Sequence, residues 1–398
     1  MECQHRSLGL RGQVLSTAAA ALVMASIGTL YTWSIFVAPI EAEFGQSRAG
    51  SSLVFSVATV AFTGGMFASP WLLPRRTPQS AALLSCLLAA AGLALSAAGS
   101  SIWLIFLGFG ALFGLANGLA YGNSLHVAQQ SAPHRPGLHT GIVVSSYMLG
   151  SIIGSPLLGR VLEIGGYRLA FLVLAAYLVA AGVLAFVLLG HARIEDGPAA
   201  RSAGPAESRA SFGALAVLWT VFFLSSLVGV MVLAHAAPLA ASVPGGEHHL
   251  VLAAVLVALG NGLGRLAGGG LSDRLQPRVL LFGAPAMIGV SLAMATAFQR
   301  PEVLLTALFL VGIGYGCIAG GLPAIVARSY GSHSMRSLYG RLFTAWGVAG
   351  LAGPYLAGAL FDAHDNYVLA TAAAAVAALL AASIGLTYRA PAASGGAT

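Results

Sequence analysis

The sequence predicts an all-α polytopic membrane protein with twelve transmembrane helices, arranged as two pseudo-symmetric six-helix bundles. Three observations support this fold class. Hydrophobic residues make up 58% of the 398 positions and charged residues only 8%, whereas a soluble domain carries about 25% charged residues. Lipid must therefore solvate most of the chain. The apolar runs are also long enough to cross a bilayer, and the second half of the chain repeats features of the first.

The apolar runs give the predicted helices in chain order. A spanning helix needs about 20 mainly apolar residues. The runs that meet this requirement are 14–40, 50–73, 80–99, 102–130, 138–162, 168–190, 212–240, 249–272, 279–297, 302–327, 338–361 and 366–388. The first run is too long for the hydrophobic region of a cleaved signal peptide, so we expect it to persist as a spanning helix.

The arginines orient these helices. All 19 basic residues are arginine, and an even number of spans places both termini on one side. The arginines on that side are Arg6, Arg11, Arg75, Arg76, Arg135, Arg193, Arg201, Arg209, Arg274, Arg278, Arg328, Arg336, Arg341 and Arg389. Those on the other side are Arg48, Arg160, Arg168 and Arg300. Because positively charged loops stay in the cytoplasm, we expect both termini to be cytoplasmic. We expect the membrane to be a bacterial inner membrane. The same distribution explains the basic charge, so no nucleic acid is expected as a partner.

An internal repeat defines the predicted domains. The polar stretch 193–210 has no periodic apolar face and is predicted to be a cytoplasmic linker between bundles 1–192 and 211–398. A shift of 199 residues superimposes several Gly, Pro, aromatic and acidic positions: Pro39 on Pro238, Gly141 on Gly340, Tyr147 on Trp346, Gly154 on Gly353 and Glu163 on Asp362. Parallel repeats around a central site are typical of alternating access.

Two short motifs resemble those of a known family. Residues 269–274, GGLSDR, resemble the Gly-x-x-x-Asp-Arg loop of the major facilitator superfamily, and residues 154–159, GSPLLG, are similar to the Gly-Pro motif of its fifth helix. The equivalent loop after the second span, residues 69–76, lacks the acidic member. The resemblance implies the major facilitator fold and secondary transport by alternating access. The predicted spans contain no nucleophile–base set or metal-ligand cluster, so we expect neither enzymatic activity nor a cofactor.

A narrower resemblance concerns the substrate. Residues 30–36, LYTWSIF, and 261–265, NGLGR, are similar to the first and eighth helices of the oxalate/formate antiporter family, which is related to proton-linked monocarboxylate transporters. This resemblance implies that Arg265 binds a substrate carboxylate. It also implies that Tyr121, Tyr147 and Tyr315 line the cavity. Residues 339–346, YGRLFTAW, align with a stretch that carries a second cation in the oxalate transporter, and Trp346 takes the place of that lysine. One remaining cation favours a monocarboxylate.

The polar residues within the spans support the same site. A central arginine costs roughly 2.5–3.5 kcal/mol to insert, so Arg265 is expected to face a wet cavity or a partner, and its guanidinium suits a carboxylate. Alternatively, Arg265 snorkels toward Asp273. Asn261 lies one turn before Arg265 and is expected to orient the guanidinium or bind substrate, although a bond between helices is also compatible. His235 is a candidate for proton coupling, with a hydrogen-bonded structural role as the alternative.

An aromatic set completes the predicted site. The rings of Tyr31, Tyr121, Tyr147, Tyr315, Trp346 and Phe343 would enclose a small anion, although packing is the alternative for each. We therefore predict transport of a small monocarboxylate such as lactate or pyruvate with a proton, by a protein that functions as a monomer. An oxalate/formate-type antiporter is the alternative within transport. A channel or a substrate-sensing receptor is the alternative from another class.

Overall fold

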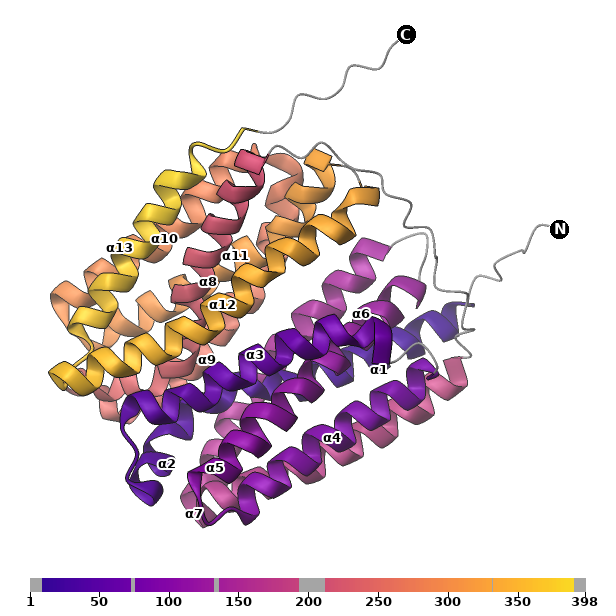
Figure 1. Ribbon diagram of the computed structural model, residues 1–398, viewed down its shortest axis with the longest axis horizontal. Helices are drawn as coiled ribbons and strands as arrows, with labels where there is room; N and C mark the ends of the chain where they lie inside the picture. Colours follow the sequence, from indigo (N-terminus) through magenta and orange to yellow (C-terminus); the bar gives the residue numbers. More distant parts are fainter. Residues whose placement is uncertain (1–8, 73–75, 132–135, 193–211, 331, 390–398) are drawn as a thin grey trace, which may run out of the picture. The chain divides into compact units, whose positions relative to one another are not determined.

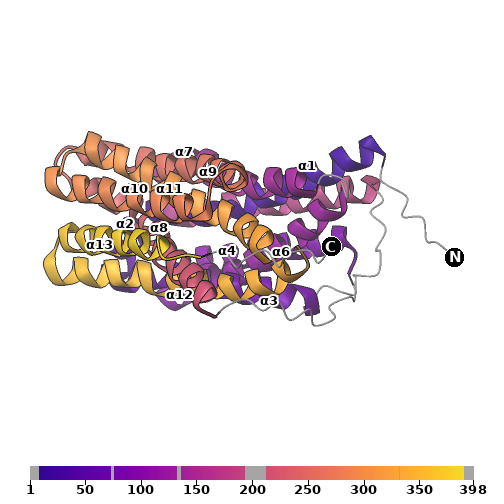
Figure 2. The ribbon, with the colours of Figure 1, turned by 90° about the horizontal axis from the view of Figure 1, so that it is seen from above.

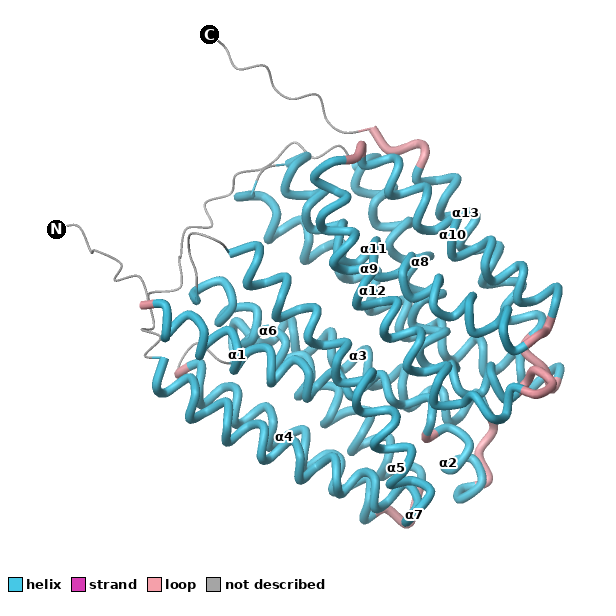
Figure 3. Tube along the Cα trace, turned by 180° about the vertical axis from the view of Figure 1, so that it is seen from behind, coloured by secondary structure: helices cyan, strands magenta, loops and turns pink. Residues whose placement is uncertain are grey.

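The helices of the protein match the predicted spans closely. The computed structural model describes residues 9–72, 76–131, 136–192, 212–330 and 332–389, and no strand occurs within these ranges (Figures 1 and 3). The elements are α1 (Leu10–Ile27), η1 (Gly28–Ile35), α2 (Val37–Phe44), α3 (Arg48–Leu72), α4 (Pro78–Ala98), α5 (Ile102–Ile105), η2 (Phe106–Phe113), α6 (Gly114–Ser131), α7 (Pro136–Ala192), α8 (Phe212–Ala241), η3 (Gly246–His249), α9 (Leu250–Arg274), α10 (Pro277–Phe298), α11 (Pro301–Tyr330), α12 (Ser332–His364) and α13 (Val368–Gly385).

Within the described residues, ten helical segments are long and apolar enough to cross a membrane. One of them, in α7, is two helices that join end to end: Gly165 leaves helical geometry, and Gly166 has φ 70°, a left-handed value that favours glycine. The predicted spans 138–162 and 168–190 are therefore both present. α12, which contains more polar residues, occupies the predicted span 338–361. The chain is a multi-pass membrane protein.

The first predicted span, 14–40, ends too late. The chain passes from α1 into the 3₁₀ segment η1, and a separate short helix, α2, begins at Val37. Pro39 lies in the first turn of α2, where its missing N–H is tolerated. The span itself is Leu10–Ile35.

The chain packs as two compact units. Unit 1 contains Met1–Thr32 and Val57–Arg201, and unit 2 contains Trp33–Ser56 and Ser202–Thr398. The segment Trp33–Ser56, called the 33–56 segment below, thus packs with unit 2 although its chain neighbours on both sides belong to unit 1. The predicted linker 193–210 lies outside the described residues, and the domain boundaries predicted from the repeat remain predictions.

Unit 1 is built on close pairs of helices. α7 packs along both α1 and α4. Gly28 approaches the Tyr147 carbonyl so closely that a Cβ there would overlap it, and Gly150 meets the Ala25 carbonyl in the same way. α3 and α6 approach through Gly65 and its partners on α6, so that main chain meets main chain.

In unit 2, α9 and α11 form the tightest pair. Figure 2 shows α9, α10 and α11 running alongside one another, and α8 packs on α12 and α13. Glycines on α9 face carbonyls of α11, and glycines on α11 face carbonyls of α9. The pairs are Gly260 with Phe309, Gly264 with Ile313, Gly268 with Cys317, Gly312 with Val257, Gly316 with Asn261 and Gly320 with Arg265. A Cβ at any of these glycines would overlap the facing carbonyl oxygen, so the two helices form a glycine ladder.

Candidate functional site

The candidate cation of the site lies on α9. Arg265 Nε donates a hydrogen bond to Asn261 Oδ1 at 2.8 Å, one helical turn away. Asn261 is fully buried and Arg265 is half-buried. The bond fixes the plane of the guanidinium, which is what the spacing predicts for a residue that orients Arg265. The side chain of Asp273, the alternative partner, lies outside the described residues.

The side-chain amide of Asn261 bonds Arg265 through Oδ1 and also contains a nitrogen atom, Nδ2. Its Nδ2 is buried and has no hydrogen-bond partner among the described residues. A buried amide donor without a partner costs roughly 1–3 kcal/mol, so such a group is commonly explained by a ligand or water. Asn261 also lies on the glycine ladder, where its carbonyl faces Gly316. The main chain at this position is therefore held rigidly while the side chain retains a donor.

Three aromatic residues predicted for the site meet in unit 2. Trp346 Nε1 donates to Tyr315 Oη at 2.7 Å, and the Phe343 and Trp346 rings stack with centroids 5.3 Å apart. All three side chains are buried. Tyr315 packs on Gly229 of α8, where a Cβ would overlap the ring. Tyr315 also precedes Gly316, so the glycine ladder connects this cluster to Asn261.

The other three predicted aromatic residues meet in unit 1. The rings of Tyr31 and Tyr147 are 5.3 Å apart, and those of Tyr121 and Tyr147 are 6.1 Å apart. Tyr147 Oη donates to Asn117 Oδ1 at 3.1 Å, and Phe62 packs edge-to-face on both Tyr121 and Tyr147. Phe62 and Asn117 are not among the residues predicted from the sequence. Asn117 lies one turn before Tyr121 on an apolar helix, a signal that could have identified it.

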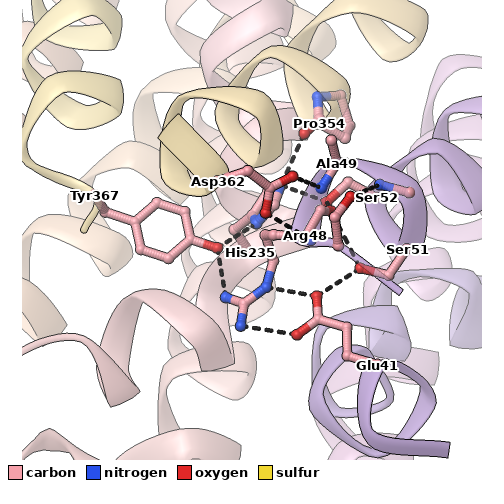
Figure 4. A network of polar contacts seen from close by, with 11 residues as sticks. Glu41, Arg48, Ala49, Ser51, Ser52, His235, Pro354, Asp362 and Tyr367 are labelled. Atoms are coloured by element: carbon pink, nitrogen blue, oxygen red, sulfur yellow. Dashed lines mark hydrogen bonds and ion pairs between the residues drawn. The ribbon is translucent and has the colours of Figure 1, made fainter. Parts of the chain in front are cut away.

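His235 is held in a different network, shown in Figure 4. The ring is fully buried on α8. Its Nε2 lies 2.9 Å from the Pro354 carbonyl and 3.1 Å from Ser52 Oγ, and its Nδ1 lies 2.7 Å from Tyr367 Oη. A carbonyl only accepts, so Nε2 bears the hydrogen in the neutral ring and Nδ1 accepts from the Tyr367 hydroxyl. Both roles left open for His235, structural and titrating, are compatible with this geometry.

The same network holds the 33–56 segment. Arg48 Nη1 donates to Tyr367 Oη at 2.8 Å, and its Nε and Nη2 bond the two oxygens of Glu41 at 2.6 and 2.9 Å. Asp362 accepts from the main-chain N–H groups of Arg48 and Ala49, both at 2.8 Å, and so satisfies the first turn of α3. Burial raises the pKa of the Tyr367 hydroxyl, against the opposing effect of Arg48, so this group remains a neutral donor.

The comparisons with known proteins agree with this fold. A model of the Major Facilitator Superfamily matches residues 18–354 and 250–397, so the chain belongs to that superfamily. A crystal structure of a bacterial homolog of the human lysosomal transporter Spinster, in an inward-facing and unoccupied conformation, superimposes with a TM-score of 0.77. That match covers 96% of this chain and 97% of the other at 14% identity, and it supports the fold alone.

Three curated relatives are similar over most of their length. The probable nitrate/nitrite transporter NarK2 of Mycobacterium tuberculosis is 29% identical, covering 90% of this chain and 91% of the relative. The oxalate:formate antiporter of Oxalobacter formigenes is 22% identical, covering 86% and 83%. Human monocarboxylate transporter 11 is 24% identical, covering 89% and 78%. These relatives are transporters and not enzymes, and the resemblance noted in the sequence is confirmed at the level of family.

Proposed function

We propose that this protein transports a small monocarboxylate, of the lactate or pyruvate type, together with a proton by alternating access. The observation that carries the proposal is the pair formed by Arg265 and Asn261. A neutral amide orients the guanidinium without itself adding a negative charge, and a guanidinium suits a carboxylate. The names of these relatives refer to oxalate, formate, monocarboxylates, nitrate and nitrite, all of which are small anions.

The aromatic residues support a substrate with one charged end. In unit 2, Tyr315, Trp346 and Phe343 present ring faces and a hydrogen-bonded pair. A lysine at position 346 would add a second cation for a dicarboxylate, and Trp346 instead provides an apolar wall. In unit 1, Tyr31, Tyr121 and Tyr147 form a second aromatic cluster, to which we assign a role in enclosing the substrate. We further propose a monomer in a bacterial inner membrane with cytoplasmic termini.

Flux into proteoliposomes tests the proposal. Purified protein should take up labelled lactate or pyruvate with saturable kinetics, and Arg265→Gln should abolish this uptake. Arg300→Gln, at an exposed arginine outside the spans, is the matched control and should transport normally. Retention of saturable uptake by Arg265→Gln refutes the assignment. Competition with formate, oxalate, nitrate and nitrite identifies the substrate class directly.

Coupling is tested in the same vesicles. Alkalinisation of the external medium during uptake indicates symport with a proton. A requirement for internal anion, with unchanged external pH, indicates an antiporter of the oxalate/formate type instead. Very fast flux that does not saturate indicates a channel, and binding of the anion without any flux indicates a receptor.

A further inference from the structure

The 33–56 segment is fastened to the rest of unit 2 by one continuous set of polar contacts. The bonds run from Glu41 through Arg48 to Tyr367 and from there to His235 (Figure 4). Arg48 is the central member, because its side chain bonds Glu41 and Tyr367 while its main-chain N–H bonds Asp362. Its guanidinium also lies over the Phe361 ring, 4.4 Å from the centroid.

The direction of the hydrogen bonds makes this fastening depend on a neutral histidine. Tyr367 Oη accepts from Arg48 and donates to His235 Nδ1. Protonation of Nδ1 turns this nitrogen into a hydrogen-bond donor. The hydrogen of the Tyr367 hydroxyl then has no acceptor there and must rotate away from the ring. The imidazolium then shares the Tyr367 oxygen with the Arg48 guanidinium, and two cations converge on one hydroxyl.

The charged groups around His235 come from every element that meets it in this network. Arg48 of α3 is a cation, Glu41 of α2 and Asp362 of α12 are anions, and Tyr367 before α13 contributes a neutral hydroxyl. Glu41 is already bonded at both oxygens to Arg48, and Asp362 to main-chain N–H groups. Among the described contacts, neither carboxylate bonds the His235 ring while the segment is held in place. The positive charge of an imidazolium therefore gains a carboxylate partner only after the segment shifts.

Tyr367 also borders a small cavity. The cavity has a volume of about 50 Å³ and is lined by apolar residues together with polar ones, among which are Ser242, Thr296, Gln299 and Asn366. A single water needs roughly 10–15 Å³ of such volume, so the cavity is large enough for several. His235 itself is fully buried. Tyr367 lines the cavity and also bonds His235, so it is the residue that connects the two.

We propose that the proton of the transport cycle binds His235 at Nδ1 by way of Tyr367, and that its binding unfastens the 33–56 segment from the rest of unit 2. This inference rests on the proposed function and names its coupling site. The neutral state holds the segment against α8, α12 and Tyr367, and the protonated state releases it. Arg265 would bind the anion, whereas His235 and Tyr367 would bind the proton at a separate place in the same unit.

The first test separates exchange from accumulation. Exchange of labelled for unlabelled carboxylate at equal concentrations moves no net protons, whereas uphill accumulation requires an imposed proton gradient. His235→Gln keeps hydrogen-bonding groups but does not titrate, and Tyr367→Phe keeps the ring and removes the relay. Both variants should lose accumulation, and His235→Gln, which holds the neutral arrangement permanently, should also exchange more slowly than the wild type. The matched controls His248→Gln and Tyr355→Phe, at exposed positions, should retain both activities. Normal accumulation by His235→Gln overturns the proposal.

A second test does not depend on flux. Hydrogen exchange of the full chain in nanodiscs is followed for residues 41–56 at pH 6 and pH 8, after correction for the intrinsic pH dependence of exchange. In the wild type, protection should be lower at pH 6 than at pH 8 by up to about fourfold, because a free imidazole has a pKa of about 6.5 and is only partly protonated at pH 6. His235→Gln should show equal protection at both pH values, and α4 should not change in either protein.

Each result of the two tests either supports the proposal or overturns it. Equal protection of the wild-type segment at both pH values, or a wild-type response in His235→Gln, overturns the proposal even if a variant loses all flux. If the wild type moves no carboxylate, the proposed function fails, while the response of residues 41–56 still shows whether protonation of His235 releases the segment.

Discussion

Replacing Asn261 by aspartate tests the role of Arg265 most sharply. The substitution Asn261→Asp preserves the size of the side chain and the hydrogen bond to Arg265 Nε, which is 2.8 Å long. It adds one negative charge beside the guanidinium. If Arg265 binds the substrate carboxylate, the new carboxylate competes with the substrate for the same positive charge. If Arg265 only stabilises the fold, the new ion pair leaves the protein as stable as before or more so.

The magnitude follows from the geometry. Two unit charges about 4 Å apart interact by about 4 kcal/mol at an effective dielectric constant of 20. Each 1.36 kcal/mol corresponds to a factor of ten, so binding of the anion should weaken by up to about a thousandfold. The control Asn261→Ala removes the hydrogen bond without adding charge, which costs roughly 1.5–3 kcal/mol for a bond to a charged group.

The assay is the dissociation constant of the anion, measured by calorimetry in detergent, together with the melting temperature. We expect Asn261→Asp to bind more weakly than Asn261→Ala while melting at or above the wild-type temperature. Binding by Asn261→Asp that equals or exceeds that of Asn261→Ala would refute the reasoning, because it would show that the charge of Arg265 is not used for the substrate.

Three further substitutions give separate predictions. Gly229→Ala drives a Cβ into the Tyr315 ring and should lower the free energy of unfolding by roughly 1–3 kcal/mol, seen as a lower melting temperature in detergent. Tyr147→Phe leaves the buried Asn117 oxygen without its donor and should cost roughly 1–3 kcal/mol by the same measurement. Trp346→Lys adds a second cation and should make oxalate a competitor of lactate uptake, which the wild type resists; unchanged selectivity would contradict the monocarboxylate assignment.

Matched controls exist for the two stability predictions. A Cβ added at Gly269 would meet no atom within 4 Å, so Gly269→Ala should leave the melting temperature unchanged. Tyr355 is exposed, so Tyr355→Phe should also have no effect. A decrease with either control equal to that of its partner would show that the buried contacts are not the cause.

Most of the fold follows from the sequence because bilayer thickness sets the length of each apolar run. The predicted second, seventh and eighth spans, for example, agree with α3, α8 and α9 to within a few residues. The predicted end of the first helix is wrong because apolar composition continues through Pro39 into α2, and hydropathy alone does not detect the boundary between η1 and α2. The i, i+4 spacing of Asn261 and Arg265 indicated their bond as one of the alternatives left open, and the structure contains it.

The network around His235 could not be predicted in the same way. Arg48 and Tyr367 are 319 residues apart, and nothing in either local sequence indicates their bond. The repeat even suggests equivalence where the structure shows a difference. Asp362 accepts from the main chain of α3, whereas its repeat partner Glu163 forms an exposed ion pair with Arg160 three residues away. Long-range pairing of polar groups depends on the tertiary arrangement, which local patterns do not encode.

The glycine ladder between α9 and α11 has a consequence for how substrate preference can diverge. Asn261 and Arg265 have their carbonyls against Gly316 and Gly320, and Tyr315 is adjacent to the same contact. The main chain that bears these side chains is therefore fixed by contacts that involve no side chain of the site. We expect side chains on this frame to tolerate exchange while the glycines do not. A deep mutational scan should then show new selectivities at a few side-chain positions, set within a strip of glycines where almost every replacement is lost.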